Sequence, residues 1–430
     1  MKGTYLVSGA KNAGPKLPIA ALLTKEKCIF RNIPRISDTY RTVDALTSLG
    51  CSVRFLDKNS IEVQSADINS SEIPLEAMSA RQSVLFIGAT LARTGQVTIY
   101  PLRGDAIGKR PINRHLEGIK ALGGTVQEIN NRMEISMPAR PKSTTYIFEK
   151  NTHCGTENLI LASVFNDGKV ILKNAAQEPE VDNLIECLNK MGAKIKRVEP
   201  RVIEIEGVEP LLKGVAVSSI YDRLEAATAL VLSVMTGGNI IVKNISKELL
   251  EPLLEVMKKI GVEISFKKNT AKIIKIHKPL KPIKIVTDWH PGFMTDWQPL
   301  TTLLLANMAK GKSVIHERIF ETRWRYLNEL QKMGIKHDLF HPKKHGPEYY
   351  NFNDSEYNAK EAYAANVYGP TKLQPAELNS HDVRAGMDML LASLVANGKS
   401  IIDDPANHID RGYENIVEKL NNLGADIKRI

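Results

Sequence analysis

The chain has 430 residues, of which 43% are hydrophobic and 25% charged, a composition typical of a soluble globular protein with more than one core. Its net charge is +10, but the lysines are spread along the chain, which disfavours a nucleic-acid binder and favours a cleft that attracts a small polyanion. No apolar run is long enough to span a bilayer, no secretory signal is recognisable, and the four cysteines form no Cys-x-x-Cys pair. We therefore expect a cytoplasmic protein with neither a membrane nor a nucleic-acid partner.

In chain order, the strongest signal is a helix that ends in apolar-x-x-apolar-Gly and is followed by a short strand. It occurs six times, and its final glycines are Gly50, Gly123, Gly192, Gly261, Gly334 and Gly424. The apolar residues lie three apart on one helical face, and glycine is the residue that ends a helix in a left-handed cap. Consecutive glycines lie 73, 69, 69, 73 and 90 residues apart, which predicts six repeats of about 70 residues.

Several repeats carry an earlier glycine turn between a helix and an Ile- and Val-rich strand, so each repeat is predicted to mix helices and strands. The last interval is about 20 residues too long, and residues 338–378 (rich in Tyr, Asn, His and Pro) are expected to form an extended hairpin or surface insertion. Six repeats predict two α/β domains of three repeats each. We expect one domain at 12–220 and the other at 1–11 with 221–430, with a ligand site in a cleft between them.

Residues 103–111 combine one carboxylate, three cations and two glycines in the sequence RGDAIGKRP. By composition alone a basic surface turn is the commoner interpretation. The alternative is a mobile catalytic loop at 102–112, with Gly104 and Gly108 as flexible points and Asp105 as a proton-transfer group over a bound anion.

Seven motifs, in order along nearly the whole chain, decide between these interpretations, because together they resemble the enolpyruvyl transferases. The motifs are SGAKNA (8–13), GDAIGKRP (104–111), NAAQEPE (174–180), HPGFMTDWQ (290–298), FETR (320–323), DVRA (382–385) and HIDRGYE (408–414). The resemblance implies two inside-out α/β barrels, each of three repeats, and no metal or organic cofactor. Residues 8–13 and 408–414 favour the branch that transfers enolpyruvyl from phosphoenolpyruvate to UDP-N-acetylglucosamine, the first committed step of peptidoglycan synthesis. We expect a monomer.

The resemblance assigns cations to the phosphate and carboxylate of phosphoenolpyruvate, for which bidentate Arg forks are suited. The residues it assigns to this substrate are Lys11, Asn12, Arg110, Arg384 and Arg411. Arg81 and Arg323 would support the anionic cleft. Since these residues come from both halves of the chain, domain closure would assemble the site.

The resemblance also assigns the proton transfers, to a catalytic set of Lys11, Asp105, Asp296 and Arg384. Asp296 matches the base that accepts the sugar hydroxyl proton, although an Asp after a Thr is also a common helix N-cap. Asp105 stands where most relatives carry Cys and some carry Asp, in the position that donates a proton to C3 of the enol or helps the phosphate to depart. Arg103, Lys109 and Arg110 would hold its carboxylate ionised until bound phosphoenolpyruvate neutralises them. Because fosfomycin acts on the loop thiol of the family, we expect resistance.

The nucleotide side rests on the resemblance alone. The residues assigned to UDP-N-acetylglucosamine are Asn12, Arg81, Arg110, Pro111, Ile112, Asn113, Arg114, Lys150, Thr152, His153, Asp296 and Ile319. Asn113 stands where relatives usually have Asp, and Cys154 where they usually have Gly.

Three alternatives stay open at this point. The sister enzyme of the family transfers enolpyruvyl to shikimate 3-phosphate, and a Gly-Asp followed by Arg-Pro occurs in it too. A catalytically silent paralogue that binds UDP-sugars would explain the departures at Asn113 and Cys154. A basic nucleic-acid binder would show steeply salt-dependent binding.

Overall fold

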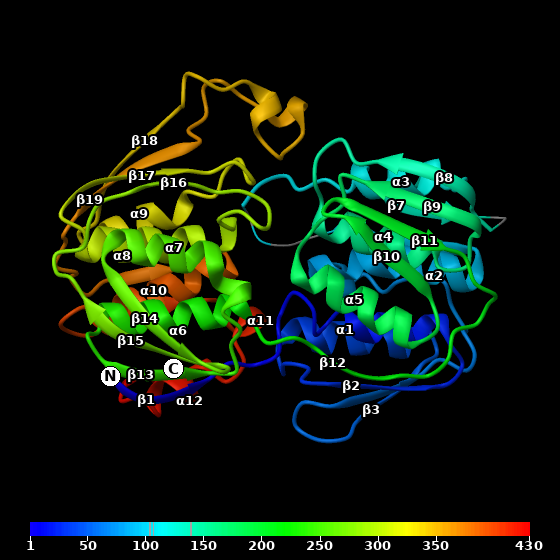
Figure 1. Cartoon of the computed structure of the whole chain (residues 1–430), viewed down its shortest axis with the longest axis horizontal. Helices are drawn as coiled ribbons and strands as arrows, with labels where there is room; N and C mark the ends of the chain where they lie inside the picture. Colours follow the sequence, from blue (N-terminus) through cyan, green and yellow to red (C-terminus); the bar gives the residue numbers. More distant parts are fainter. Residues whose placement is uncertain (103–104, 106, 138–139) are drawn as a thin grey trace. The chain divides into compact units, whose positions relative to one another are not determined.

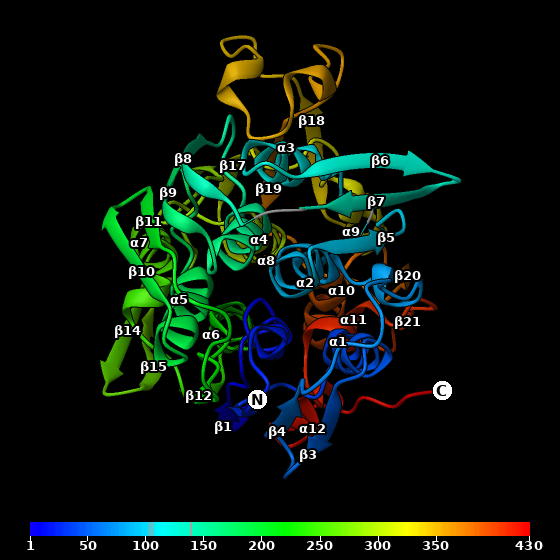
Figure 2. The ribbon, with the colours of Figure 1, turned by 90° about the vertical axis from the view of Figure 1, so that its right-hand side faces the viewer.

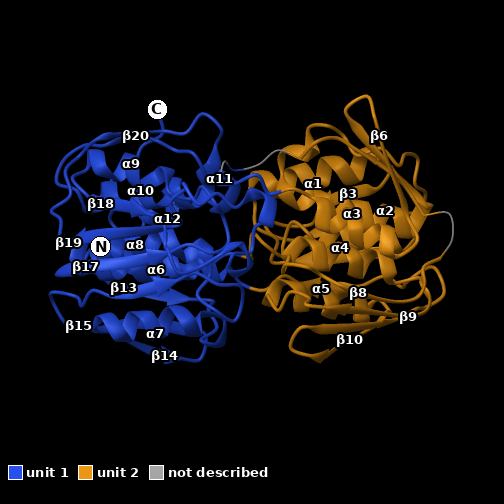
Figure 3. Cartoon of the chain, turned by 90° about the horizontal axis from the view of Figure 1, so that it is seen from above, with its two compact units in different colours: residues 1–8, 105–110, 221–430 blue, residues 9–104, 111–220 orange. Residues whose placement is uncertain are grey.

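The computed structural model describes residues 1–102, 105, 107–137 and 140–430. The chain divides into two compact units (Figure 3): unit 1 comprises Met1–Ser8, Asp105–Arg110 and Tyr221–Ile430, and unit 2 comprises Gly9–Gly104 and Pro111–Ile220. These limits differ from the expected ones in two places. The first change falls after residue 8 rather than 11, and residues 105–110, expected in the first domain, group with unit 1 through contacts described below. Arg103 and Gly104 of the predicted loop lie outside the described residues.

Apolar helices form the interior of each unit. In unit 1 these are α6 (Arg223–Met235), α8 (Gln298–Met308) and α10 (Val383–Val395), and α8 packs against both of the others. In unit 2 they are η1 (Leu17–Leu23), α2 (Phe86–Thr94) and α4 (His153–Ser163), with α2 against both of the others. All thirteen residues of α6 are buried, as expected for a helix that is apolar on every face.

Amphipathic helices lie outside these, and each ends at one of the six predicted glycines. They are α1 (Ser37–Ser48), α3 (Asn113–Ala121), α5 (Pro179–Lys190), α7 (Glu251–Ile260), α9 (Arg325–Lys332) and α12 (Ile416–Asn421). The six glycines have φ between 94° and 106°, the left-handed region that a side chain disfavours. The predicted six left-handed helix ends are therefore confirmed.

The strands form one sheet per repeat, and four of the six sheets share a single four-stranded pattern. In unit 1, β1 (Lys2–Leu6) pairs parallel with β13 (Asn239–Lys243), which continues antiparallel to β15 (Thr270–Ile276) and β14 (Val262–Lys267). Because β1 supplies this parallel edge, the first residues of the chain belong to unit 1 (Figure 1). A second sheet of this pattern in unit 1 has the order β16 (Lys284–Val286), β17 (Gly311–His316), β19 (Ala364–Gly369), β18 (Lys336–Phe340).

Two of the other sheets follow the same plan, and the last two have three strands and two strands. They are β12 (Ala216–Ser218), β2 (Lys27–Arg31), β4 (Ile61–Gln64), β3 (Ser52–Phe55); β8 (Lys142–Ile147), β9 (Asp167–Lys173), β11 (Val202–Glu206), β10 (Lys194–Glu199); β5 (Gln96–Ile99), β7 (Arg132–Ser136), β6 (Thr125–Ile129); and β20 (Glu377–Asn379), β21 (Ile401–Asp403). Short helices complete the fold: η2 (Ala77–Ser79), η3 (Arg81–Leu85), η4 (Glu248–Leu250), η5 (Thr295–Trp297), η6 (Pro347–Tyr349), η7 (Asp354–Glu356) and α11 (His408–Gly412). The mixed α/β fold of repeated units is thus confirmed, with six separate sheets in the described part of the chain rather than a closed barrel.

The extra residues of the fifth repeat lie between β18 and β19, at 341–363, which we name the hairpin insertion (Figures 1 and 2). The corresponding hairpins β6–β7 and β14–β15 turn at residues 130–131 and 268–269. The insertion is narrower than the expected 338–378, because both ends of that range are strands that pair within the sheets of their repeats. Within the described ranges, we find no helix with the length and apolar composition needed to cross a membrane.

Candidate active site

The candidate proton donor, Asp105, is paired with an arginine of unit 1. Its Oδ1 lies 2.7 Å from Nη1 of Arg411, and the two side chains are only 16% and 8% exposed. Arg411 is on α11, which packs against α10. At this junction a Cβ on Gly412 would come within 2.2 Å of Val383, so glycine permits the close approach of the two helices. The packing therefore fixes the guanidinium that receives Asp105.

Two further contacts hold the loop segment 107–109 in unit 1. The Lys109 N–H donates to Oε1 of Glu321 at 2.6 Å, and the Thr322 N–H donates to the Ile107 carbonyl at 3.3 Å. A Cβ on Gly108 would lie 2.3 Å from the Glu321 carboxylate, so a side chain there would have to displace that carboxylate from its contact with Lys109. Glu321 belongs to the FETR motif, but the sequence assigned it no role.

Arg110 ends this segment in an unusual backbone conformation. Its φ is 51°, in the left-handed region that non-glycine residues rarely occupy. Its guanidinium lies over the Phe320 ring, 5.5 Å from the centroid. Unit 1 thus contacts Asp105 through the side chain of Arg411, Lys109 through that of Glu321, and Arg110 through that of Phe320.

The candidate base, Asp296, lies in η5 between two arginines of unit 1. Nη2 of Arg323 donates to its Oδ1 at 2.8 Å, and Nε of Arg384 lies 3.8 Å from its Oδ2. Burial lowers the pKa of Arg323 and of Arg384, but Asp296 outweighs this at Arg323, and Tyr413 followed by Asp296 outweighs it at Arg384, so both pKa values are raised. Asp382 caps α10 by accepting from the N–H groups of Arg384 and Ala385, which orients the first turn toward the site.

Behind Asp296, the buried carboxylate of Glu317 connects several elements. It accepts from the hydroxyls of Thr287 and Thr295 and from the N–H of Ile319, at 2.8 to 2.9 Å. Thr295 in turn accepts from Nη1 of Arg323 at 2.8 Å. Burial raises the pKa of Glu317, and Arg323 opposes that rise. Ile319, expected near the sugar, therefore has its backbone fixed by the network that orients Arg323.

In unit 2, the predicted pair Lys11 and Asn12 lies in the turn before η1. Nζ of Lys11 is 3.0 Å from Oδ2 of the buried Asp38. The turn closes through the Gly14 N–H, which donates to the Ala10 carbonyl at 2.7 Å. A Cβ on Gly9 would lie 1.8 Å from the Asn32 carbonyl oxygen, so the SGAKNA motif needs glycine there.

Most of the residues assigned to UDP-N-acetylglucosamine lie near the N-termini of α3 and α4 in unit 2, whereas Arg110, Asp296 and Ile319 belong to unit 1. Arg81 donates from Nη2 to the Pro111 carbonyl at 3.3 Å, and Ile112 precedes the first residue of α3, Asn113. Arg114 donates to the Asn151 carbonyl at 3.4 Å, which connects α3 to the segment that carries Lys150. Thr152 caps α4 by accepting from the Gly155 N–H. Helix N-termini favour anions.

Sequence reasoning missed a buried cluster beside His153. Nζ of Lys16 lies 2.6 Å from Oε2 of Glu157 and 3.1 Å from Nε2 of His153. Burial and Lys16 lower the pKa of His153, but Glu157 outweighs them and raises it to about 9. The available signal was a lysine placed directly before the apolar run 17–23.

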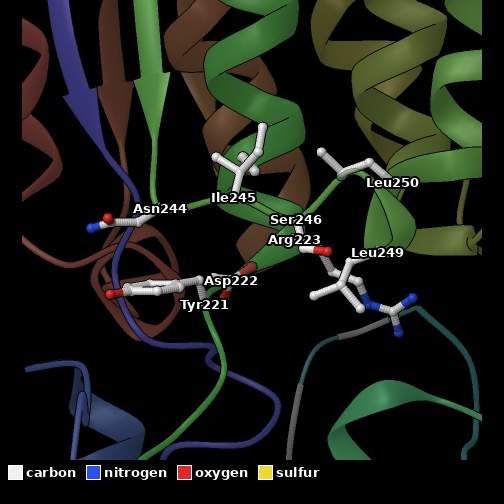
Figure 4. Close-up of a pocket in the computed structure, with 9 residues that line it drawn as sticks. Tyr221, Asp222, Arg223, Asn244, Ile245, Ser246, Leu249 and Leu250 are labelled. Carbon is white, nitrogen blue, oxygen red and sulfur yellow. The ribbon is translucent and has the colours of Figure 1, made fainter. Parts of the chain in front are cut away.

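A small pocket of unit 1 lies elsewhere, at the start of α6 (Figure 4). Its lining includes Tyr221, Asp222, Arg223 and Asn244, and none of the predicted site residues. Asp222 caps α6 through the N–H groups of Leu224 and Glu225, so its role there is structural. In the described ranges, no group of three His, Cys, Asp or Glu side chains is placed to hold a metal ion.

Comparison with known proteins extends over the whole chain. A family profile described as EPSP synthase (3-phosphoshikimate 1-carboxyvinyltransferase) matches residues 1–420. A UDP-N-acetylglucosamine 1-carboxyvinyltransferase of Finegoldia magna is 35% identical over 100% of this chain and 96% of its own length. A protein of the same name from Chlamydia abortus is 37% identical over 99% of this chain and 95% of its own length.

Solved structures share the fold. The enolpyruvyl transferase NikO from Streptomyces tendae superposes with a TM-score of 0.85 at 21% identity, over 100% of this chain and 96% of that one. An EPSP synthase from Acinetobacter baumannii gives a TM-score of 0.70 at 17% identity, over 99% and 96% of the two chains.

Proposed function

The chain belongs to the enolpyruvyl transferase family, and we propose that it transfers the enolpyruvyl group of phosphoenolpyruvate to the 3-hydroxyl of UDP-N-acetylglucosamine, releasing phosphate. The observation that carries this proposal is the full-length identity of 35% and 37% to two enzymes named for that reaction. The solved EPSP synthases are 16–17% identical, which favours the UDP-sugar acceptor over shikimate 3-phosphate.

The reaction is an addition followed by an elimination. In the addition, the sugar 3-hydroxyl oxygen bonds to C2 of phosphoenolpyruvate, Asp296 accepts the hydroxyl proton, and Asp105 donates a proton to C3. In the elimination, C3 returns a proton to the Asp105 carboxylate, the double bond re-forms, and the C2–O bond to phosphate breaks, so that the proton taken from the sugar hydroxyl leaves with the phosphate. The contacts with Arg323 and Arg384 hold the Asp296 carboxylate in a fixed orientation, which supports its role as the acceptor of the hydroxyl proton.

The proposed phosphoenolpyruvate set consists of Arg110, Arg384 and Arg411 in unit 1, with Lys11 and Asn12 in unit 2. Fixed cations serve here because developing charge on the departing phosphate is stabilised by groups that need not reorganise. The burial of Arg384 and Arg411, each about 6–7% exposed, supports such preorganisation.

The proposed UDP-sugar set adds Arg81, Pro111, Ile112, Asn113, Arg114, Lys150, Thr152, His153, Asp296 and Ile319. The proposal places the protein in peptidoglycan synthesis, and through it in cell shape and division. We propose that it works in the cytoplasm as a monomer.

An acceptor-choice assay tests the proposal. The enzyme is given phosphoenolpyruvate with either UDP-N-acetylglucosamine or shikimate 3-phosphate, and phosphate release is measured. Release with the UDP-sugar alone is expected. Release only with shikimate 3-phosphate refutes the acceptor assignment, and thermal stabilisation by the UDP-sugar without phosphate release identifies a silent binding paralogue.

A further inference from the structure

The hairpin insertion (341–363) folds around its own small aromatic core. Tyr350, Phe352 and Tyr363 are 1%, 5% and 0% exposed, and Tyr349 and Tyr357 pack against them. The rings of Tyr350 and Phe352 stack with centroids 5.1 Å apart. An aromatic core of this kind gives a loop-rich segment a defined shape.

This core is attached to one particular stretch of unit 1, residues 316–318. The Glu317 N–H donates to the Tyr363 carbonyl at 2.9 Å, and the Asn351 N–H donates to the Arg318 carbonyl at 2.8 Å. Nε2 of His316 lies 3.1 Å from the Tyr350 hydroxyl. The insertion is therefore hydrogen-bonded to the three consecutive residues 316–318.

Arg318 is the main side-chain connection between the two. Its Nε donates to the Tyr349 carbonyl at 3.0 Å, and its guanidinium lies 4.0 Å from the centroid of the Tyr349 ring. The His345 ring also stacks on the Tyr349 ring, with the two ring centroids 3.7 Å apart. Asp288 accepts from Nη1 of Arg318 at 2.9 Å. Arg318 thus contacts both Tyr349 of the insertion and Asp288, and these contacts fix the orientation of its side chain.

The stretch that the insertion holds leads directly into the candidate site. Glu317 accepts from the Ile319 N–H, Glu321 accepts from the Lys109 N–H of the loop, and Arg323 pairs with Asp296. We propose that the hairpin insertion is a positioning element that fixes residues 316–323 and thereby sets the affinity for the acceptor, with the Tyr349–Arg318 contact as its main connection. This inference rests on the proposed function for its kinetic part only.

The test compares Tyr349→Ala with Tyr349→Phe, which keeps the ring that Arg318 contacts. Tyr40→Ala, which truncates a partly exposed tyrosine of unit 2, is the control for loss of an aromatic side chain. Amide hydrogen exchange measured by mass spectrometry should be at least about fivefold faster over residues 316–323 in Tyr349→Ala, and unchanged in the other two. Unchanged exchange over 316–323 in Tyr349→Ala overturns the proposal, whether or not the enzyme turns over.

The kinetic part uses the same variants. In Tyr349→Ala the KM for UDP-N-acetylglucosamine should rise about fivefold with kcat within twofold of the starting enzyme, and Tyr349→Phe should restore it. In an Arg318→Ala background, the Tyr349→Ala substitution should have little further effect, because the two side chains act through one contact. Additive effects of the two substitutions would contradict a connection through the Tyr349–Arg318 contact. A starting enzyme without turnover would refute the proposed function, and the hydrogen-exchange result alone would then test the positioning role of the insertion.

Discussion

Replacing Asp105 separates a chemical role from a mechanical one. The carboxylate receives the Arg411 guanidinium at 2.7 Å, and both side chains are largely buried. If Asp105 only anchors the loop, Asp105→Asn should keep most activity, since an amide oxygen still accepts from Arg411 and the anchors at Ile107 and Lys109 remain. If it is the general acid, Asp105→Asn and Asp105→Ala should lose activity alike, because neither can deliver the proton.

We expect the second outcome, with kcat lower by roughly 10²–10⁴-fold, the usual contribution of a positioned acid or base. This corresponds to about 3–5.5 kcal/mol of transition-state stabilisation. The assay is phosphate release at saturating substrates, with UDP-sugar affinity measured separately by calorimetry. That affinity should change by less than about threefold, because most of the residues assigned to the nucleotide belong to unit 2. A kcat for Asp105→Asn within threefold of the starting enzyme would refute the acid role.

Three further outcomes are expected. Fosfomycin should give no time-dependent inhibition, since the loop carries Asp105 and no thiol, whereas Asp105→Cys should make the enzyme sensitive; potent inactivation of the unmodified chain contradicts this. In urea titrations, Gly9→Ala should lower the free energy of unfolding by at least about 2–3 kcal/mol, because the new Cβ clashes with Asn32. Gly123→Ala should lower it by only about 1–2 kcal/mol, because a Cβ there meets nothing within 4 Å and only the positive φ is unfavourable. Equal losses would show that the structure relaxes around the clash at Gly9. Burial lowers the pKa of His115 to about 3, so between that pH and about 6.5 the unfolded chain binds a proton that the folded chain does not. The free energy of unfolding should therefore fall as pH falls through this range, by up to about 1.4 kcal/mol per pH unit. His115→Gln should flatten this slope, and an unchanged slope would count against the buried neutral imidazole.

The repeats could be predicted from the sequence because their signals are local. A left-handed glycine after an amphipathic helix needs only the preceding turn, and all six such glycines were identified in this way. The limits of the hairpin insertion were less accessible. Its flanking strands are short, and residues 364–369 are recognisable as a strand only by pairing with β17 and β18.

The site was predicted mainly by resemblance, since its contacts are long-range. Asp105 and Arg411 lie 306 residues apart, and no spacing rule connects them. Glu321 could not be assigned a role in advance, because its partner is a backbone N–H of Lys109 rather than a side chain. The left-handed backbone of Arg110 also had no signal, since that conformation is rare for residues with a Cβ.

The proposed role of Asp105 as the acid, at a position where the resemblance gives most relatives a thiol, has a consequence for its pairing with Arg411. The Arg411 guanidinium, which lies 2.7 Å from Asp105, is also one of the groups assigned to phosphoenolpyruvate. A substrate anion that bound Arg411 would exchange partners with Asp105 and free its carboxylate to face the substrate. A neutral thiol would form no ion pair with Arg411, so this exchange is particular to a carboxylate at residue 105.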